Sequence, residues 1–93
     1  MKQRGLADVW NEEFRERFEE FWQAWPSNRR VGKKAALKAY AKALRDREFP
    51  VTPAEILKGA QDYAAHCRTR GTDPQFIAHP ATWLNAGRWA DER

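Results

Sequence analysis

Cysteine and serine are almost missing from this chain: Cys67 and Ser27 are the only examples in 93 residues. One cysteine cannot form an internal disulfide, which favours a reducing, cytoplasmic compartment. Ser27 lies in a turn after Pro26 with no catalytic motif around it, and carboxylates pair only on the solvent face of the first helix. The glycines sit singly, which excludes a phosphate-cradling loop. We therefore expect no enzyme and no catalytic residue.

Long apolar runs and metal-ligand spacings are missing too. No stretch approaches the roughly 20 apolar residues of a membrane span, and the charged N-terminus is followed by no apolar signal-peptide core. His66 and Cys67 are adjacent while His79 lies far along the chain. That arrangement lacks the paired spacings of zinc ligands. We expect no metal, no cofactor, no small-molecule substrate and no membrane partner.

Aromatic residues and alanine are what the chain has in quantity. Five Trp, five Phe and two Tyr supply large buried surfaces to a small core. Alanine is abundant and valine scarce, which favours helix over sheet. The prediction is an all-α fold, a small single-domain bundle of three main helices plus a short C-terminal helix. The expected helices cover about 9–25, 32–47, 53–70 and 80–86, and residues 1–7 are expected to be flexible.

The first predicted helix has Asp8 as N-cap and ends before Pro26. At 100° per residue one face of it is aromatic. This stripe consists of Trp10, Phe14, Phe18, Phe21, Trp22 and Trp25. Burial in the core is one interpretation. The other keeps Trp22 or Trp25 near the surface, where it could stack on a base or insert into a partner.

The third predicted helix has the clearest local signal. Thr52 and Glu55 form a capping box around Pro53, and Gly71 follows the helix as its C-terminal stop. Its apolar face places Cys67 as a small core residue, with a reactive thiol as the alternative. Beyond it, short helical turns are expected after Asp73 and His79. Apolar cover for the other helices is expected from Phe76, Ile77, Trp83, Leu84 and Trp89.

Positive charge is concentrated in one segment. Residues 26–50 carry eight bases and two acids, whereas residues 1–25 carry four and six, and 51–93 carry five and five. On the second predicted helix four bases share one face, beside an apolar strip of Leu37, Tyr40, Ala41 and Leu44. These bases are Lys34, Lys38, Lys42 and Arg45. An ordinary solvated face is one interpretation, but surface helices usually mix signs through i,i+4 pairs. A polyanionic partner is the other.

A connector of further bases precedes that helix, so the predicted contact surface is wider than the helix face. Its members are Arg29, Arg30, Lys33, Lys34, Lys38, Lys42 and Arg45, with Trp22 or Trp25 as stacking residues. One hypothesis is a DNA-binding module that contacts phosphates independently of sequence. The other is a protein-interaction module whose basic helix meets an acidic surface. The charge pattern fits both.

Two blocks of sequence carry a resemblance. The first is FWQAWP followed by RRVGKKA, residues 21–26 and 29–35, and the second is HPATWLNAGRW, residues 79–89. Together they resemble the small C-terminal domain of phage and prophage replication proteins, which are replisome-organiser or primosomal proteins akin to replication protein O. The resemblance covers about residues 14–91. Trp25 and Tyr40 stand where Tyr and Trp, respectively, are more usual.

The resemblance implies a role in phage DNA replication in a bacterial host cell, through DNA, a replicative helicase or its loader. Such proteins generally carry an N-terminal winged-helix domain, and only seven residues precede the predicted N-cap of the first helix here. We expect either an excised domain or a unit that acts alone, as an accessory factor or as an inhibitor of a host protein such as a defence complex. Arg88 is expected either to pack over Trp83 or Trp89 or on helix carbonyls, or to contact the partner.

Overall fold

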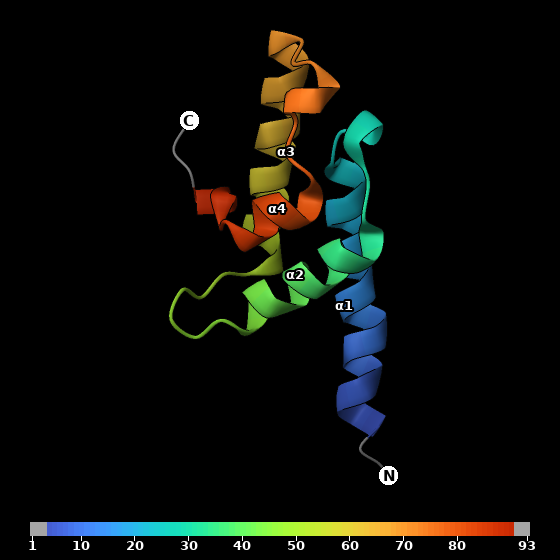
Figure 1. Ribbon diagram of the computed structural model, residues 1–93. Coiled ribbons are helices and arrows are strands. Elements are labelled where there is room, and N and C mark those ends of the chain that lie inside the picture. The colour runs from blue at the N-terminus through green and yellow to red at the C-terminus, as the bar shows by residue number, and fades with distance from the viewer. Residues whose placement is uncertain (1–3, 91–93) are drawn as a thin grey trace.

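The computed structural model describes the backbone of residues 4–90 and the side chains of residues 12–90. Four α-helices and three short 3₁₀ helices make up this part of the chain, which contains no strand (Figure 1). The α-helices are α1 (Arg4–Ala24), α2 (Lys33–Arg45), α3 (Pro53–Arg70) and α4 (Pro80–Asn85). The 3₁₀ helices are η1 (Ser27–Arg29), η2 (Pro74–Phe76) and η3 (Arg88–Ala90). The predicted all-α fold, with three main helices and a short fourth, is confirmed.

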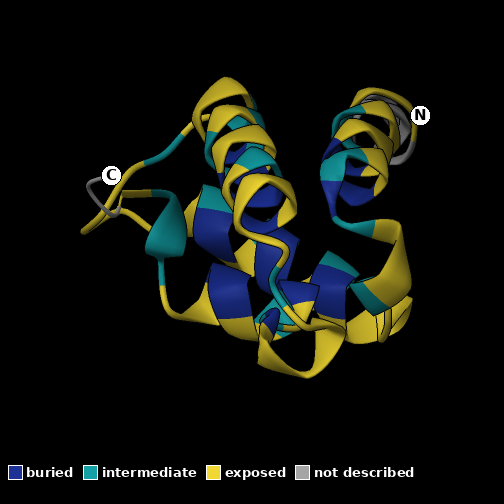
Figure 2. Ribbon diagram, turned by 90° about the horizontal axis from the view of Figure 1, so that it is seen from above, coloured by how far each residue is buried: buried dark blue, intermediate teal, exposed yellow. Residues whose placement is uncertain are grey.

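The helices pack as two pairs around an aromatic core. α2 lies against α4, and α1 lies against α3, with η3 covering part of α3 (Figure 1). The buried faces of the helices turn toward one another and their exposed faces outward (Figure 2). The largest fully buried side chains belong to Trp25, Trp83, Tyr40, Phe21, Ile56, Leu84 and Pro80.

α1 begins earlier than predicted and buries the predicted face. It starts at Arg4 rather than Val9, so Asp8 lies inside the helix and is not its N-cap. Residues 1–3 of the segment predicted to be flexible, and the side chain of Trp10, lie outside the described residues. The core interpretation of the aromatic stripe is confirmed for its last four members, and Phe14 is half-buried. The four are Phe18, Phe21, Trp22 and Trp25.

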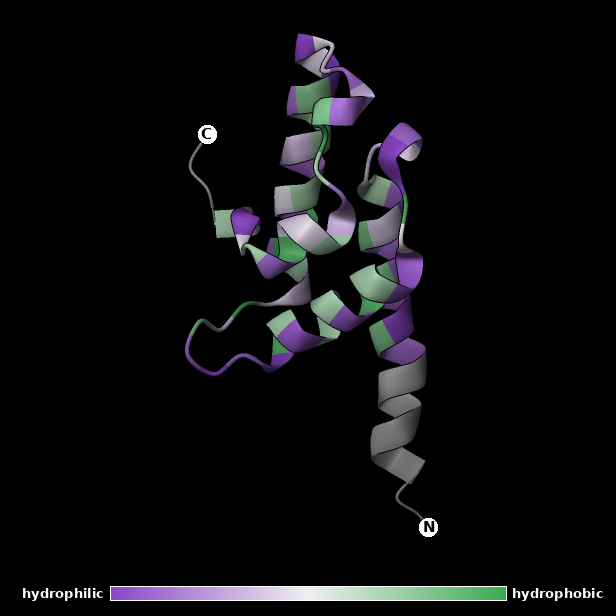
Figure 3. Cartoon of the chain, in the orientation of Figure 1, coloured by the Kyte–Doolittle hydropathy of each residue, from purple (hydrophilic) through white to green (hydrophobic). Residues whose placement is uncertain are grey.

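α2 is shorter than predicted and buries the predicted strip only in part. It begins after Gly32, whose φ of 68° is the left-handed conformation that glycine adopts most readily. It ends at Arg45, because the carboxylate of Asp46 accepts the backbone N–H groups of Glu48 and Phe49, at 2.8 and 3.0 Å, and turns the chain. Hydrophilic and hydrophobic residues alternate along it (Figure 3). The buried residues are Ala36, Ala39, Tyr40 and Ala43, whereas the predicted Leu37, Ala41 and Leu44 are only half-buried.

The local signals around α3 are confirmed. The Thr52 hydroxyl accepts the Glu55 N–H at 3.2 Å, and the Glu55 carboxylate accepts the Thr52 N–H at 2.8 Å. Gly71 ends the helix with a φ of 63°. Cys67 is buried, as predicted for a small core residue. In the C-terminal segment one prediction is wrong: Phe76 is 74% exposed, because the single turn of η2 directs the next residue, Ile77, into the core instead.

Candidate nucleic-acid interface on α1 and α2

A groove with a strong excess of positive charge separates α1 from α2. It encloses about 470 Å³ and is called the α1–α2 groove below. Its lining residues are Phe14, Arg15, Leu37, Lys38, Ala41, Lys42 and Arg45. α2 starts beside α1 and diverges from it toward its own C-terminus, so the groove occupies the angle between the two helices (Figure 1). Four of the seven residues are cationic, and no acid is among them.

Three lysines of α2, two of which line this groove, are available for binding. Lys34, Lys38 and Lys42 are exposed and form no ion pair within residues 12–90. They follow one another at i,i+4 on α2, which places them about 6 Å apart along the helix axis. Arg45 continues the same face and is also exposed. The predicted basic stripe is therefore one continuous surface in the folded chain.

A second stretch of groove adjoins the first and is less positive. It shares Arg15 and Leu37 with the α1–α2 groove and adds Lys33, Lys34 and Glu19. The Glu19 carboxylate accepts a hydrogen bond from Gln23 at 2.9 Å and pairs with Lys33 at 3.2 Å. These two interactions hold the pKa of Glu19 below its usual value, the Gln23 bond contributing most. Lys33 also lies 5.6 Å from the centre of the Trp22 ring. Its charge is partly satisfied within the chain.

Residues 13–87 match the family model of the Legionella vir region protein LvrA C-terminal domain. The chain belongs to this family. The match spans both grooves and the packed parts of all four helices. No curated protein and no solved structure matches the chain. The comparisons give no support to the resemblance to phage replication proteins.

In this member of the LvrA C-terminal domain family, the two tryptophans considered for base stacking are core residues. Trp25 is 1% exposed, and its indole N–H donates to the Ala78 carbonyl at 3.2 Å. It also packs against Tyr63 and Trp83, with ring centres 5.1 and 5.2 Å away. Trp22 is 8% exposed and stacks on Phe18. The surface interpretation of these residues is wrong, since neither presents a ring face to an incoming base.

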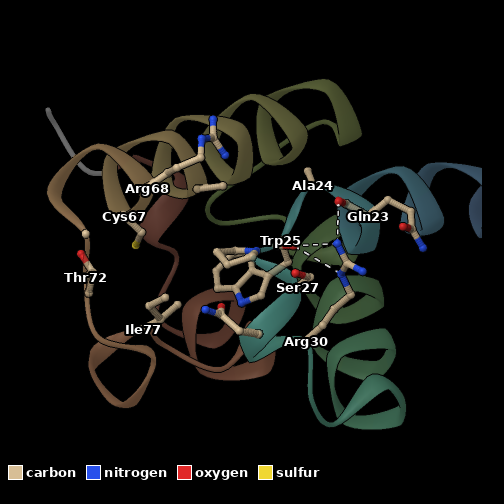
Figure 4. A pocket seen from close by; sticks show the side chains of 13 residues that line it. Gln23, Ala24, Trp25, Ser27, Arg30, Cys67, Arg68, Thr72 and Ile77 are labelled. Carbon is tan, nitrogen blue, oxygen red and sulfur yellow. Dashed lines mark hydrogen bonds between the residues drawn. The ribbon is translucent and has the colours of Figure 1, made fainter.

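Two of the predicted phosphate-binding arginines hold the fold together instead. Arg29 donates from Nε to the Ile77 carbonyl at 3.1 Å, which ties η1 to the segment before α4. Arg30 donates to the carbonyls of Gln23 and Trp25, both at 3.0 Å, where α1 ends (Figure 4). A cation at a helix C-terminus satisfies carbonyls that have no partner within the helix. Both guanidinium groups bond to the protein's own backbone, and both residues remain half-exposed.

Arg88 also has a role in packing. Its guanidinium carbon lies 5.5 Å from the centre of the Tyr63 ring. Packing over a ring was one interpretation of Arg88, and the ring that it contacts is Tyr63 rather than Trp83 or Trp89. Sequence spacing indicates neighbours along one helix, whereas this contact joins η3 to α3.

Arg15 lines the candidate interface but was not among the residues predicted from the sequence. It lies on α1, outside the aromatic stripe, and it lines both stretches of groove. Only the packing of α1 beside α2 brings it to the lysines. Within residues 12–90 no three potential metal-binding side chains cluster. No helix in the described part of the chain has the length and apolar character needed to cross a bilayer.

Proposed function

We propose that this chain is a non-catalytic DNA-binding module that contacts phosphates from the α1–α2 groove and the exposed face of α2. One observation carries the proposal: the groove has four cationic lining residues and, among the described ones, no carboxylate. Like charges held this close repel one another, a cost that a polyanion would relieve. The named family states no ligand, so the support comes from geometry and charge. A role in phage replication stays a prediction that rests on the two sequence blocks.

The proposed mode of binding has a quantitative signature. Phosphate contacts release counterions, so the logarithm of the binding constant falls with the logarithm of salt concentration by about 0.9 per contact on duplex DNA. Four or five contacts from this surface give a slope of roughly −4. Contacts of this kind position a protein without reading bases. We therefore expect similar affinity for unrelated sequences.

Charge reversal with a matched control tests the proposal. The test variant is Lys38→Glu/Lys42→Glu, which reverses two cations of the groove. The control variant is Arg68→Glu/Arg70→Glu, which makes the same change in net charge at exposed positions near the end of α3. Labelled DNA at about 50 mM salt, where phosphate contacts are strong, is titrated with each protein. Circular dichroism checks that both variants retain their helices.

The expected result is a loss of at least tenfold in affinity for the groove variant and a small loss for the control. The salt slope is expected to fall by about two units in the groove variant, because two contacts are gone. Equal losses in the two variants would show that net charge, and not this surface, governs binding. Failure of the unmodified protein to bind either single- or double-stranded DNA would end the proposal.

A second candidate is a protein-interaction module, and one observation favours it. Phe49 is 70% exposed, yet the Asp46 carboxylate fixes the loop that carries it. Beside it lies a depression lined by Lys42, Leu84 and Trp89, among others. An exposed aromatic side chain on an ordered loop is typical of anchors in protein interfaces. The candidate partners remain a helicase, a helicase loader or a host defence complex, with inhibition as one outcome.

A capture experiment with paired phenylalanine variants tests this candidate. Phe49→Ser and Phe76→Ser each remove one exposed aromatic ring, and the two rings are 70% and 74% exposed. A protein partner is expected to be recovered from a nuclease-treated bacterial lysate by the unmodified chain and by Phe76→Ser, but not by Phe49→Ser. Loss of the recovered protein on nuclease treatment alone would count against the candidate.

A further inference from the structure

The floor of the α1–α2 groove is apolar, although its walls are basic. Phe14 from α1 and Leu37 and Ala41 from α2 line the groove and are half-buried, so part of each side chain faces it. Arg15 stands on the α1 side, and Lys38 and Lys42 stand on the α2 side. A ligand in this groove must therefore offer negative charge at its edges and apolar surface in its middle.

We infer that the α1–α2 groove receives an unpaired nucleic-acid strand, with its phosphates against the cations and its bases against the apolar floor. This inference rests on the proposed DNA-binding function and names the form of nucleic acid. Single strands expose both parts, because unpaired bases turn out of the stack while the backbone follows a basic groove. In a duplex the base faces are stacked inside and cannot reach such a floor.

The dimensions of the groove argue in the same direction. The α1–α2 groove encloses only about 470 Å³. The major groove of duplex DNA alone is roughly 12 Å wide, and the whole duplex is broader. A duplex is therefore too broad to enter a groove of this volume. It could touch the ridge of α2 but could not reach Leu37 at the floor.

The lysine spacing suits a flexible strand. Lys34, Lys38 and Lys42 lie in a row along α2, about 6 Å apart along its axis. A duplex backbone curves away from a straight helix after a short contact, whereas an unpaired strand can bend to follow the row. Binding of an unpaired strand therefore uses all three lysines together with Arg15 on the facing wall.

The experiment compares four probes on the full chain by fluorescence anisotropy. The probes are an oligothymidine and an oligouridine of about a dozen nucleotides, within the usual site sizes, a duplex DNA of equal length, and polyglutamate. The variants are Leu37→Ser, which makes the floor polar, and Leu37→Tyr, which adds an aromatic ring to it. Leu44→Ser is the matched control, because Leu44 is also half-buried on α2 but does not line the groove.

Tighter binding of single strands than of duplex is expected. Leu37→Ser is expected to weaken single-strand binding about five- to tenfold and Leu37→Tyr to strengthen it by a similar factor, as for stacked bases. Duplex binding is expected to stay unchanged in both variants, and Leu44→Ser to change neither. If Leu37→Ser fails to fold, Leu37→Tyr still tests whether the groove floor contacts the bases. Preference for oligouridine over oligothymidine supports an unpaired strand in the groove but overturns the proposal that this strand is DNA.

Each contrary result has a distinct meaning. Duplex bound as tightly as single strands, with no effect at Leu37, overturns the inference while the proposed DNA binding stands. No binding of any nucleic acid overturns both. Polyglutamate bound as tightly as oligothymidine overturns the inference and assigns the groove to an acidic protein.

Discussion

Two tyrosine hydroxyls in the core have different surroundings. The Tyr63 hydroxyl accepts the Ala78 N–H at 2.9 Å. The Tyr40 hydroxyl is buried and has no hydrogen-bond partner among the described residues. Burial raises the pKa of Tyr40 to about 12, since the ionised ring would lose its solvation. An unpaired buried hydroxyl costs stability, whereas a paired one contributes to it.

Removing the two hydroxyls is therefore expected to have opposite effects. Tyr63→Phe leaves the Ala78 N–H unpaired and is expected to lower the free energy of unfolding by about 1–3 kcal/mol. Tyr40→Phe removes a hydroxyl that has no partner in the described part of the chain, and it is expected to leave that free energy unchanged or to raise it by about 1 kcal/mol. Urea unfolding of both variants measures the difference. A larger loss in Tyr40→Phe than in Tyr63→Phe would contradict the assignment.

For single residues, the sequence showed where the basic side chains are concentrated, but it did not show which partners they have in the folded chain. Arg29, Arg30 and Lys33 were grouped with the α2 bases, because all belong to one basic segment. In the structure the two arginines donate to backbone carbonyls, and Lys33 pairs with the Glu19 carboxylate and lies over the Trp22 ring. Arg29 bonds to Ile77, which lies far along the chain. No local pattern indicates such a partner, because it depends on how the whole chain packs.

Among the helices, α3 and η3 approach each other at a glycine. A Cβ atom on Gly59 would stand 2.8 Å from the Cβ and 2.9 Å from the Cα of Trp89. Such distances are shorter than van der Waals contact, and one of the two atoms belongs to the backbone. Gly59 is therefore required in the middle of α3, although glycine weakens a helix by about 1 kcal/mol relative to alanine.

Gly59→Ala is expected to destabilise the protein despite its better helix propensity. Overpacking of this kind costs about 1–3 kcal/mol, and the gain in propensity offsets part of it. Gln61→Ala, at an exposed position two residues along α3, is the control and is expected to change stability by less than about 0.5 kcal/mol. Urea unfolding gives the stabilities, and the indole N–H signals in NMR spectra report the displacement of Trp89. An unchanged Trp89 signal in a stable Gly59→Ala variant would refute the close approach.

The helices show which signals can be read from sequence. The capping box of α3 and the glycine after it are local, and both were predicted correctly. The apolar strip of α2 was predicted only in part: Tyr40 is buried as expected, but Leu37 and Leu44 are half-buried, while the alanines beside them are buried. Small residues let α2 lie close to α4, its main neighbour. Hydrophobicity alone favours Leu37 and Leu44, because it does not indicate which helix will pack there.

Over the whole molecule, the two sequence blocks meet in the core. Trp25 from the first block packs against Trp83 from the second, and Arg29 reaches the carbonyl of Ile77 just before it. Phe21 stacks on Trp83 as well. The blocks are therefore explained by the packing of α1 and η1 against α4. Motif residues that pack in the core indicate which fold a chain has more directly than which ligand it binds. The proposed interface, in contrast, consists mostly of α2 residues that follow the first block.

Trp25 gives the strongest test of this arrangement, because it joins both halves of the core. Trp25→Ala is expected to cost about 3–5 kcal/mol, as for other large core aromatics. That is a large share of the roughly 5–15 kcal/mol that stabilises a typical domain. The helical signal and the near-ultraviolet aromatic signal are expected to be lost together in one urea transition. The reason is that the helix pairs share one core, so neither pair has a complete core of its own. Phe49→Ala, at a 70% exposed ring, is the control and is expected to change stability by less than about 0.5 kcal/mol.

Trp25→Phe preserves part of the packing, so it is expected to keep both the fold and the affinity for nucleic acid. A Trp25→Phe variant that folded but lost binding would show that Trp25 belongs to the interface.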